Sequence, residues 1–225
     1  MKTKFISFLL ILMLSASLAI GQTTDKGKTS FAILGGINFQ NMIGTDTYGN
    51  KLANDMINGY HVGINIQVPV APNLYFQPGL LFTTKGAKNT YGSLTGKYNI
   101  SYMEFPLNFV YKTLLGKGNV MIGFGPYIAY GFGGKASIYN ESTTIESDIV
   151  FKNVVEKGDP LLVAYFKTYD GGANIFAGYE LADGLFCQLN AQFGMIRINP
   201  VDNRISNDKS SVRNMGFGIS IGYRF

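Results

Sequence analysis

The chain has 225 residues with a net charge of +5 spread thinly along it, 14% aromatic residues, 28 glycines and one cysteine. The single cysteine excludes an internal disulfide framework, and the weak, dispersed positive charge argues against binding to nucleic acid. Beyond the first 21 residues, no run approaches the roughly 20 apolar residues of a membrane-spanning helix, which excludes a helical membrane protein.

Residues 1–21 have the composition of a cleaved secretory signal. Two lysines precede an apolar run from Phe5 to Leu14, which is too short to span a bilayer as a helix. Ala19 and Gly21 supply the small side chains that signal peptidase requires, so we predict cleavage directly after Gly21. No cysteine stands at this junction to accept a lipid anchor. The remainder, 22–225, is predicted to be one exported domain with a charge of +3, because two lysines leave with the signal.

Two segments show the clearest period-two alternation of side chains. In Tyr60–Val68, YHVGINIQV, every second residue from Tyr60 onward is apolar or aromatic, while the residues between them are His, Gly, Asn and Gln. Arg213–Phe225 repeats the pattern, with Met, Phe, Ile and Tyr on one face and Asn, Gly and Ser on the other. This alternation is typical of a β-strand with one apolar face.

Six further segments fit the same pattern, so the sequence predicts eight strands in all. They are Ser30–Gln40, Leu74–Lys85, Tyr98–Lys112, Asn119–Gly134, Tyr169–Leu181 and Leu185–Asn199. In the last of these, the outward set is expected to be Cys187, Leu189, Ala191, Phe193 and Met195.

The connections between these segments alternate in length. The short ones are 70–73, 113–118 and 182–184, and the long ones are 41–59, 86–97, 135–168 and 200–212. Short turns at one end, long loops at the other and an even strand number are typical of bacterial outer-membrane barrels. The sequence therefore predicts an all-β, eight-stranded antiparallel transmembrane barrel with up-and-down topology and both termini on the periplasmic side.

The apolar face also carries aromatic residues toward the strand ends and aliphatic residues between them. Tyr60 and Tyr130 lie toward the long loops, with Tyr111, Tyr179, Tyr223 and Phe225 toward the short turns. Aromatic girdles of this kind flank the hydrocarbon band of membrane barrels. The alternative is a soluble barrel with its apolar face inward, but a solvated exterior would carry more Lys and Glu than the polar face does here.

His61, the only histidine, is expected to point into the barrel. A Ser-His-acid hydrolase, as in a lipid-modifying barrel, needs a serine and a carboxylate beside its histidine, and no such trio can be picked out of the sequence. A place in an interior polar network is the favoured interpretation of His61. No catalytic, cofactor-binding or metal-binding residue is predicted, and the protein is expected not to be an enzyme.

Charged and amide side chains are expected inside the barrel. By the alternation, the inward-facing set is Glu104, Asn108, Asp170, Glu180 and Arg224. Charges inside a narrow barrel are costly unless they are paired, so we expect ion pairs and hydrogen bonds that fill the interior. A path for ions or protons is the less favoured alternative, because eight strands leave little more room than the side chains need.

Two other patterns carry no site prediction. The glycines of Gly216-x-Gly218-x-x-x-Gly222 lack the strand-to-helix context of a phosphate-binding loop, and crowding inside a barrel accounts for them. The loop residues Asp46, Asp55, Asp148 and Asp159 lack the spacing of a calcium loop. We therefore expect no bound nucleotide, metal ion or other cofactor.

Several motifs resemble the PorT-like outer-membrane β-barrel family of the Bacteroidota. They are LYFQPGLLFTTKGAK at 74–88, Tyr-Met-Glu-Phe-Pro-Leu at 102–107, Gly-Pro-Tyr at 125–127 and the terminal Gly-Tyr-Arg-Phe at 222–225. The resemblance covers nearly all of the exported chain, and the order and spacing of the motifs match. It implies an outer-membrane barrel of a Gram-negative bacterium, with an involvement in secretion or surface assembly that does not extend to every relative.

The favoured function is a structural or partner-binding role in the cell envelope. Loop 135–168 mixes charges with an apolar stretch from Ile149 to Val155, which is hard to justify in water unless it extends a strand pair or meets a partner. Expected partners are outer-membrane lipids, the barrel assembly machinery that reads the terminal Phe225, and an envelope protein at this loop or at the periplasmic end. The alternatives are a small pore and, behind it, a lipid-modifying enzyme.

Overall fold

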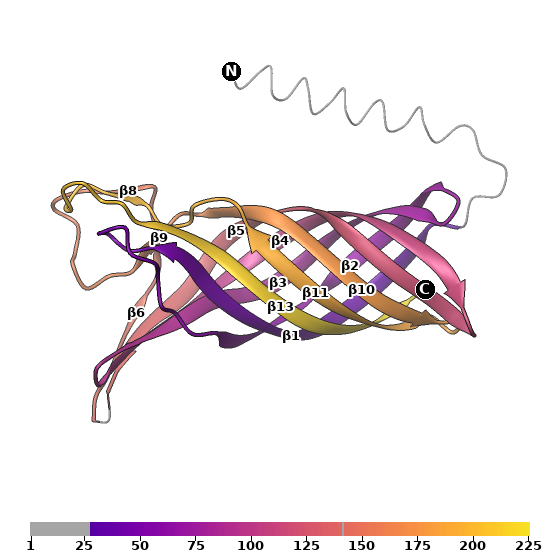
Figure 1. The fold of residues 1–225 in the computed structure, drawn as a ribbon, viewed down its shortest axis with the longest axis horizontal. Helices are drawn as coiled ribbons and strands as arrows, with labels where there is room; N and C mark the ends of the chain where they lie inside the picture. The colour runs from indigo at the N-terminus through magenta and orange to yellow at the C-terminus, as the bar shows by residue number, and fades with distance from the viewer. Residues whose placement is uncertain (1–27, 141) are drawn as a thin grey trace, which may run out of the picture.

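Eight long antiparallel strands form a closed barrel in the computed structural model, which describes residues 28–140 and 142–225 (Figure 1). Neighbours in the chain pair in order around the ring, and β1 closes it by pairing with β13. The strands are β1 (Ser30–Thr45), β2 (Ile57–Ala71), β3 (Leu74–Tyr91), β4 (Leu94–Leu115), β5 (Gly118–Tyr139), β10 (Tyr169–Leu181), β11 (Leu185–Gly194) and β13 (Ser211–Arg224). The predicted eight-stranded up-and-down barrel is confirmed.

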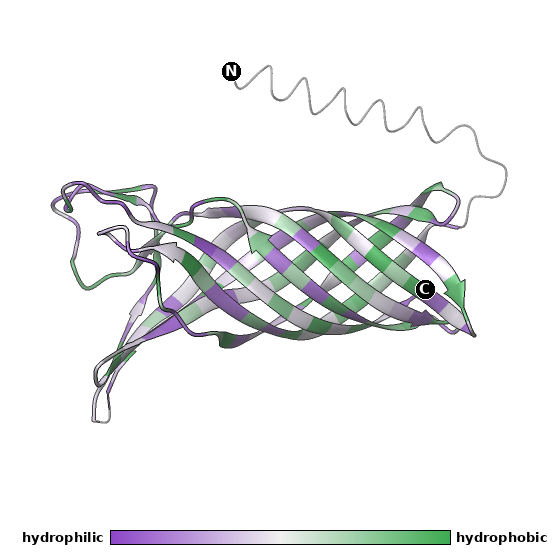
Figure 2. Ribbon diagram, in the orientation of Figure 1, coloured by the Kyte–Doolittle hydropathy of each residue, from purple (hydrophilic) through white to green (hydrophobic). Residues whose placement is uncertain are grey.

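Hydropathy alternates along the strands of the barrel (Figure 2), and side-chain burial places the apolar positions outside and the polar positions inside. At the closing seam, Ile219 is 43% exposed on the outside, whereas the adjacent Ser220 is 1% exposed on the inside. The register there pairs Ile37 with Ile219, so apolar side chains meet apolar side chains across the seam. A strand places successive side chains on opposite faces, so alternating apolar and polar residues face the lipid and the lumen in turn. The predicted orientation of the two faces is confirmed.

Aromatic contacts run around the outer face in two zones. On the side of the short turns, Phe76 contacts Phe109 at 5.5 Å and Phe225 contacts Tyr223 at 5.0 Å, measured between ring centroids. On the loop side, Tyr60 stacks on Phe82 at 5.7 Å. Exposed aliphatic side chains such as Ile64 lie between the zones. This arrangement fits a hydrocarbon band bordered by two interfaces.

The short turns gather at one end of the barrel, where the first described residues and the C-terminus also lie (Figure 1). Asn73, Gly116 and Gly184 occupy these turns with φ values of 60°, 63° and 95°. Tight hairpin turns require this backbone conformation, which Gly and Asn adopt at low cost. The residues in each short connection therefore favour its turn conformation.

The predicted loop 86–97 is wrong, because β3 and β4 continue as a hairpin beyond the membrane zone. Pairing runs to Tyr91 and Leu94, with Gly92 at φ 61° in the two-residue turn. Outside the bilayer, no lipid selects an apolar face, so the alternation of hydropathy stops while the backbone ladder continues. Strand boundaries drawn from the alternation therefore fell short here.

Loop 135–168 contains the end of β5 and four short strands. β5 extends to Tyr139 and pairs with β6 (Thr144–Asp148), forming a hairpin that projects from the barrel (Figure 1). Beyond it, β7 (Val150–Phe151) pairs with β9 (Tyr165–Phe166), and β8 (Val154–Val155) pairs with β12 (Val201–Asp202). The apolar stretch at Ile149–Val155 thus extends strand pairs, as one of its two interpretations required.

β11 ends at Gly194, five residues earlier than predicted. The backbone N–H groups of Met195 and Ile196 both donate to the carbonyl of Gly171, at 2.8 and 3.1 Å, so the chain leaves the ladder there. It crosses the barrel mouth and buries Ile198 completely. Among the described residues, no helix is long and apolar enough to cross a bilayer.

Candidate functional site

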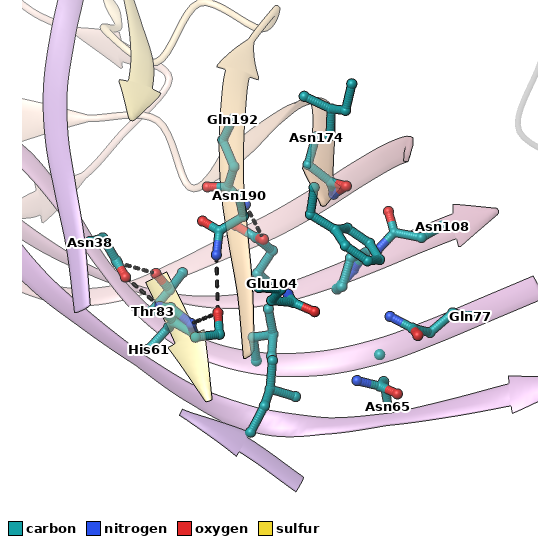
Figure 3. A pocket seen from close by; sticks show the side chains of 18 of the residues that line it. Asn38, His61, Asn65, Gln77, Thr83, Glu104, Asn108, Asn174, Asn190 and Gln192 are labelled. Atoms are coloured by element: carbon teal, nitrogen blue, oxygen red, sulfur yellow. Dashed lines mark hydrogen bonds between the residues drawn. The ribbon is translucent and has the colours of Figure 1, made fainter. Parts of the chain in front are cut away.

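His61 lies in the middle of the interior, in a network of polar side chains from four strands (Figure 3). Its Nε2 is 2.7 Å from the hydroxyl of Ser220 on β13, and its Nδ1 contacts Oδ1 of Asn38 on β1. Asn190 on β11 donates to the same hydroxyl at 3.0 Å. The predicted place of His61 in a polar network is confirmed.

The network fixes the orientation of the imidazole. The amide nitrogen of Asn38 donates to the backbone carbonyl of Thr84 at 3.1 Å, so its Oδ1 is the atom left to accept from Nδ1–H of His61. The hydroxyl of Ser220 accepts from Asn190 and lies within hydrogen-bond distance of Nε2 of His61. Contacts at both ring nitrogens therefore hold the imidazole in one orientation.

The same contacts form a Ser-His-Asn chain, which the sequence did not reveal because its members lie on three strands. Such a chain resembles a hydrolytic triad in its bonding order. However, Ser220 is 1% exposed, and the adjoining cavity has a volume of about 60 Å³, which holds a few water molecules and no lipid. The arrangement therefore stabilises the interior and gives no substrate access to the hydroxyl.

A second group of interior charges lies on the loop side of this layer. Lys85 on β3 is 2.8 Å from Oε2 of Glu104 on β4 and 3.2 Å from Oδ2 of Asp170 on β10, and all three side chains are at most 1% exposed. Tyr102 and Tyr127 present their rings to the ammonium group, at 5.6 and 4.1 Å from the ring centroids. Two carboxylates and two rings thus surround one fully buried cation.

A third group lies at the turn end. Glu180 on β10 binds Lys112 of β4 at 2.5 Å and Arg224 of β13 at 2.8 Å. It lines a cavity of about 290 Å³ that also reaches Lys28. Between this group and His61 lies an apolar cluster, formed by Ala32, Leu34, Val110, Met121, Phe176 and Phe186. Buried amides lie beside it, and Asn65 accepts from the guanidinium of Arg224 at 3.2 Å while lining the same cavity as His61. Apolar and polar side chains therefore fill this part of the interior together.

All five residues predicted to face inward are buried there, and their expected ion pairing is confirmed for Glu104, Asp170, Glu180 and Arg224. Asn108 is buried, but its Oδ1 has no hydrogen-bond partner. Sequence reasoning missed the two lysines that supply the remaining charge, Lys85 and Lys112. Both stand at ends of predicted strands, where a lysine is usually solvated, although the parity of each strand places them inward.

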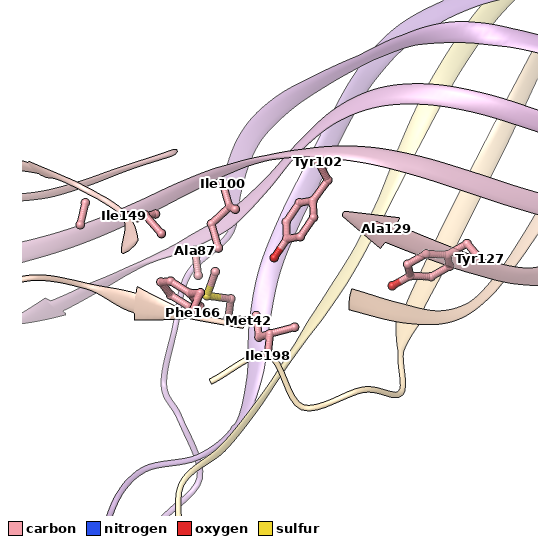
Figure 4. Close-up of a cluster of buried hydrophobic side chains, with 10 residues drawn as sticks. Met42, Ala87, Ile100, Tyr102, Tyr127, Ala129, Ile149, Phe166 and Ile198 are labelled. Atoms are coloured by element: carbon pink, nitrogen blue, oxygen red, sulfur yellow. The ribbon is translucent and has the colours of Figure 1, made fainter. Parts of the chain in front are cut away.

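An apolar cap closes the loop end of the barrel (Figure 4). Ile100 and Tyr102 of β4 meet Ile149, Phe166 and Ile198 from the long loops, and each of the five is less than 10% exposed. Backbone bonds fix the loop residues to strands, as from Ile149 N–H to the carbonyl of Gly134 at 3.0 Å. The cap therefore covers the polar interior with tightly held side chains.

Beyond the cap, Arg204 joins the two longest loops. Its guanidinium binds Asp202 at 2.6 Å and donates to the carbonyl of Pro160 at 2.8 Å. Lys152 donates to Asp159 at 2.5 Å, and this hydrogen bond holds the pKa of Asp159 below its ordinary value. Within the described residues, no group of three or more His, Cys, Asp or Glu side chains forms a metal site.

These features define an outer-membrane β-barrel with a filled lumen. The sequence profile of a family described as "Outer membrane protein beta-barrel domain" matches residues 21–225, and the chain belongs to this family. The protein is therefore an integral protein of the outer membrane, and its apolar outer face contacts the membrane lipids.

No curated protein matches the chain. Among solved structures, Ail, the attachment invasion locus protein of Yersinia pestis, in complex with the heparin analogue sucrose octasulfate, is similar at 11% identity over 88% of this chain and 100% of Ail, with a TM-score of 0.40. Neisserial surface protein A is similar at 10% identity over 88% of this chain and 100% of its own, with a TM-score of 0.44.

Proposed function

We propose that this protein is a closed, non-enzymatic membrane anchor that presents an ordered loop surface to a partner in the cell envelope. The observation that carries the proposal is the apolar cap over a lumen filled with paired charges. A pore needs a continuous wet path, whereas this interior has an apolar cap at its mouth and is filled by buried side chains below it. The small-pore alternative is therefore disfavoured.

The binding surface is proposed at the loop end. There, the side chains of Tyr48, Leu161 and Leu162 are 82%, 81% and 87% exposed. Leu161 and Leu162 follow Pro160, whose carbonyl is held by Arg204, so these apolar side chains stand on a fixed backbone. Exposed apolar residues on a rigid scaffold are typical of contact sites.

The orientation of the barrel belongs to the same proposal. Short turns and termini face the periplasm, and the long loops face outward, as in other barrels of this class. The predicted signal peptide lies outside the described residues, and the family match beginning at residue 21 supports its boundary. Closer kinship with the PorT-like barrels of the Bacteroidota, and with it a role in secretion or surface assembly, rests on the motifs at 102–107 and 222–225.

Conductance of the purified protein in planar bilayers tests the closed lumen. We expect no discrete channel steps, because the apolar cap must open before ions pass. A large open porin reconstituted in the same bilayers is the positive control. Regular, voltage-independent steps from the wild-type protein would show a pore and contradict the proposed anchor.

Photo-crosslinking in native outer membranes tests the partner surface. A crosslinking amino acid at Leu162 should capture a discrete protein, whereas the same group at Asp183, in a turn at the opposite end, should not capture that protein. Mass spectrometry identifies what is captured. Equal capture from both positions, or none from Leu162, would remove the support for the loop surface.

Two measurements test the absence of enzyme activity. A fluorophosphonate probe should leave Ser220 unlabelled in the folded protein, since the cavity admits no reagent of that size. Lipid A extracted from cells with and without the protein should have the same mass spectrum. Labelling that disappears in Ser220→Ala would instead show an accessible nucleophile.

A further inference from the structure

The hairpin of β5 and β6 ends in an open strand edge beyond the barrel (Figure 1). Each of the eight barrel strands pairs with a neighbour on both sides, whereas β6 pairs with β5 alone among the described strands. Of the five residues of β6, four are exposed and only Ser147 is half-buried, so no loop covers this edge. An unpaired edge is a template on which another strand can form.

Hydrogen bonds at the two ends of the hairpin fix its bonding pattern. The N–H of Asn140 donates to the carbonyl of Thr143 at 3.0 Å, and the N–H of Ile149 donates to the carbonyl of Gly134 at 3.0 Å. Both pairs continue the register of β5 and β6. In an antiparallel ladder, directly opposite residues exchange hydrogen bonds at every second pair. The odd-numbered residues of β6 therefore bond to β5.

The remaining backbone groups of β6 point to the open edge. Ile145 and Ser147 are the residues bonded to β5, so the N–H and carbonyl groups of Thr144, Glu146 and Asp148 face away from it. β6 contains no proline, and its register with β5 has no bulge. Three residues therefore offer regularly spaced donors and acceptors to a further strand.

The two faces of β6 differ in their side chains. Glu146 contacts Nζ of Lys135 at 3.4 Å, and Asp148 lies opposite Lys135 in the register. One face therefore carries two carboxylates at the edge with a single lysine behind them. On the other face, Ile145 lies opposite Ile138, and these side chains are 61% and 47% exposed.

These side chains select the kind of strand that can add to the edge. A second copy of β6 would place Glu146 against Glu146 when two antiparallel edges overlap fully, and like charges directly opposite each other destabilise a strand pair. A strand with basic residues on this face would instead form favourable pairs with Glu146 and Asp148. Apolar residues on its other face would cover Ile145, which is otherwise exposed to water.

We propose that β6 binds an extended segment of a partner protein by strand addition, and that this segment alternates basic and apolar residues. Backbone hydrogen bonds to Thr144, Glu146 and Asp148 provide affinity, while the side chains of Glu146 and Ile145 provide specificity. This assignment rests on the proposed function, because the partner is the envelope protein expected at the loop end.

Amide NMR with synthetic peptides tests the edge. The exported chain, folded in phosphatidylcholine nanodiscs, is titrated with a short peptide that alternates Lys and Val, and with one that alternates Glu and Val. We expect only the Lys peptide to shift the amide resonances of Thr144, Glu146 and Asp148 and to protect these amides from hydrogen exchange. The amides of Ile145 and Ser147 already donate to β5 and should be protected with and without peptide.

Three results of this titration overturn the proposal. They are equal effects of the two peptides, no saturable shift with either peptide, and new protection that does not alternate along β6. Nanodiscs without protein, titrated with labelled peptides, measure binding to the lipid alone. Rising salt should weaken the binding of the Lys peptide, since the charges involved are exposed.

Two variants with the same charge change locate the interaction. Glu146→Lys keeps the backbone N–H and reverses the charge at the edge, so it should reverse the preference between the two peptides. Glu156→Lys makes the same change at another exposed loop residue and should keep the preference for the Lys peptide. A preference that survives in Glu146→Lys, or is lost in both variants, overturns the proposal.

Glu146→Pro tests the backbone separately. Proline removes one N–H that points to the open edge and that the hairpin does not use, and proline is tolerated on edge strands. The amides of Ile145 and Ser147 should stay protected while binding of the Lys peptide is lost. Undiminished binding with the hairpin intact overturns the proposal. A failed peptide titration together with specific capture at Leu162 would remove the strand addition and leave the proposed function in place.

Discussion

The ammonium nitrogen of Lys85 lies 4.1 Å from the centroid of the Tyr127 ring, in the fully buried part of the lumen. The two residues come from β3 and β5, and β4 separates them in the sheet. The contact between Lys85 and Tyr127 joins two strands that share no backbone hydrogen bonds. Glu104 and Asp170 lie on the other sides of the ammonium group.

Removing this cation should be among the most damaging single changes. Lys85→Met leaves two buried carboxylates facing one another, and breaking a buried ion pair in this way costs about 3–5 kcal/mol. Lys112→Met is the matched control and should cost less, because Lys112 is partly exposed and Glu180 keeps Arg224. Urea titrations in lipid vesicles measure both. Equal stability of Lys85→Met and wild type would contradict the buried ion group.

Arginine at Ile219 tests the lipid-facing side of the barrel. Ile219 points outward on β13, and Ile219→Arg should lower the free energy of unfolding by roughly 2–4 kcal/mol if the residue lies near the bilayer midplane. Ile138→Arg is the control, since Ile138 is 47% exposed on the hairpin beyond the membrane. Folding titrations compare the two, and similar losses would argue against a lipid contact at Ile219.

The hydroxyl of Ser220 should contribute more to the free energy of unfolding than a single small group usually does. Ser220→Ala leaves Nε2 of His61 and the amide of Asn190 without this partner, at an expected cost of about 1–3 kcal/mol. Ser220→Asn should also be costly, because Ser220 is 1% exposed and its site has no room for a larger side chain. Ser137→Ala removes an exposed hydroxyl and should stay within about 0.5 kcal/mol of wild type. Equal midpoints for Ser220→Ala and Ser137→Ala would contradict the network.

The terminal aromatic residue should control assembly in cells. The backbone N–H of Phe225 donates to the carbonyl of Phe31 at 2.8 Å, and its ring contacts Tyr223. Deleting Phe225 should lower the heat-modifiable, folded fraction in outer membranes, because assembly machinery is expected to read this residue. Refolding in vitro is the control and should change little. Unchanged assembly in cells would remove this role.

Acid should loosen the loops before the barrel. Hydrogen bonds from Lys152 and Arg204 lower the pKa values of Asp159 and Asp202. A carboxyl with a lowered pKa stabilises the fold above its unfolded pKa, near 4, and this stabilisation is lost as the pH falls through the lower folded value. Limited proteolysis from pH 6 to pH 2.5 should show faster cleavage near Pro160 at the acid end. Cleavage that is independent of pH, or an Asp159→Asn variant that behaves as wild type, would contradict this.

The local sequence determined the strands, their two faces and the tight turns. Inside the membrane, lipid on one side and a crowded lumen on the other impose a period of two, so Ile219 and Ser220 could be assigned to opposite faces. Asn73 and Gly184 mark turns through backbone conformations that few residues adopt. These signals depend only on a residue and its near neighbours.

Only the tertiary structure decided what fills and covers the lumen. Register around the ring brings Lys85 to Glu104 and Asp170, and His61 to Ser220, across separations of up to 159 residues. The strand extensions above the membrane show no alternation of apolar and polar residues in the sequence, because no lipid contacts them there. The same holds for the cap at Ile149 and Ile198. Partners inside a closed barrel are selected by ring register and shear, and these are properties of the whole sheet.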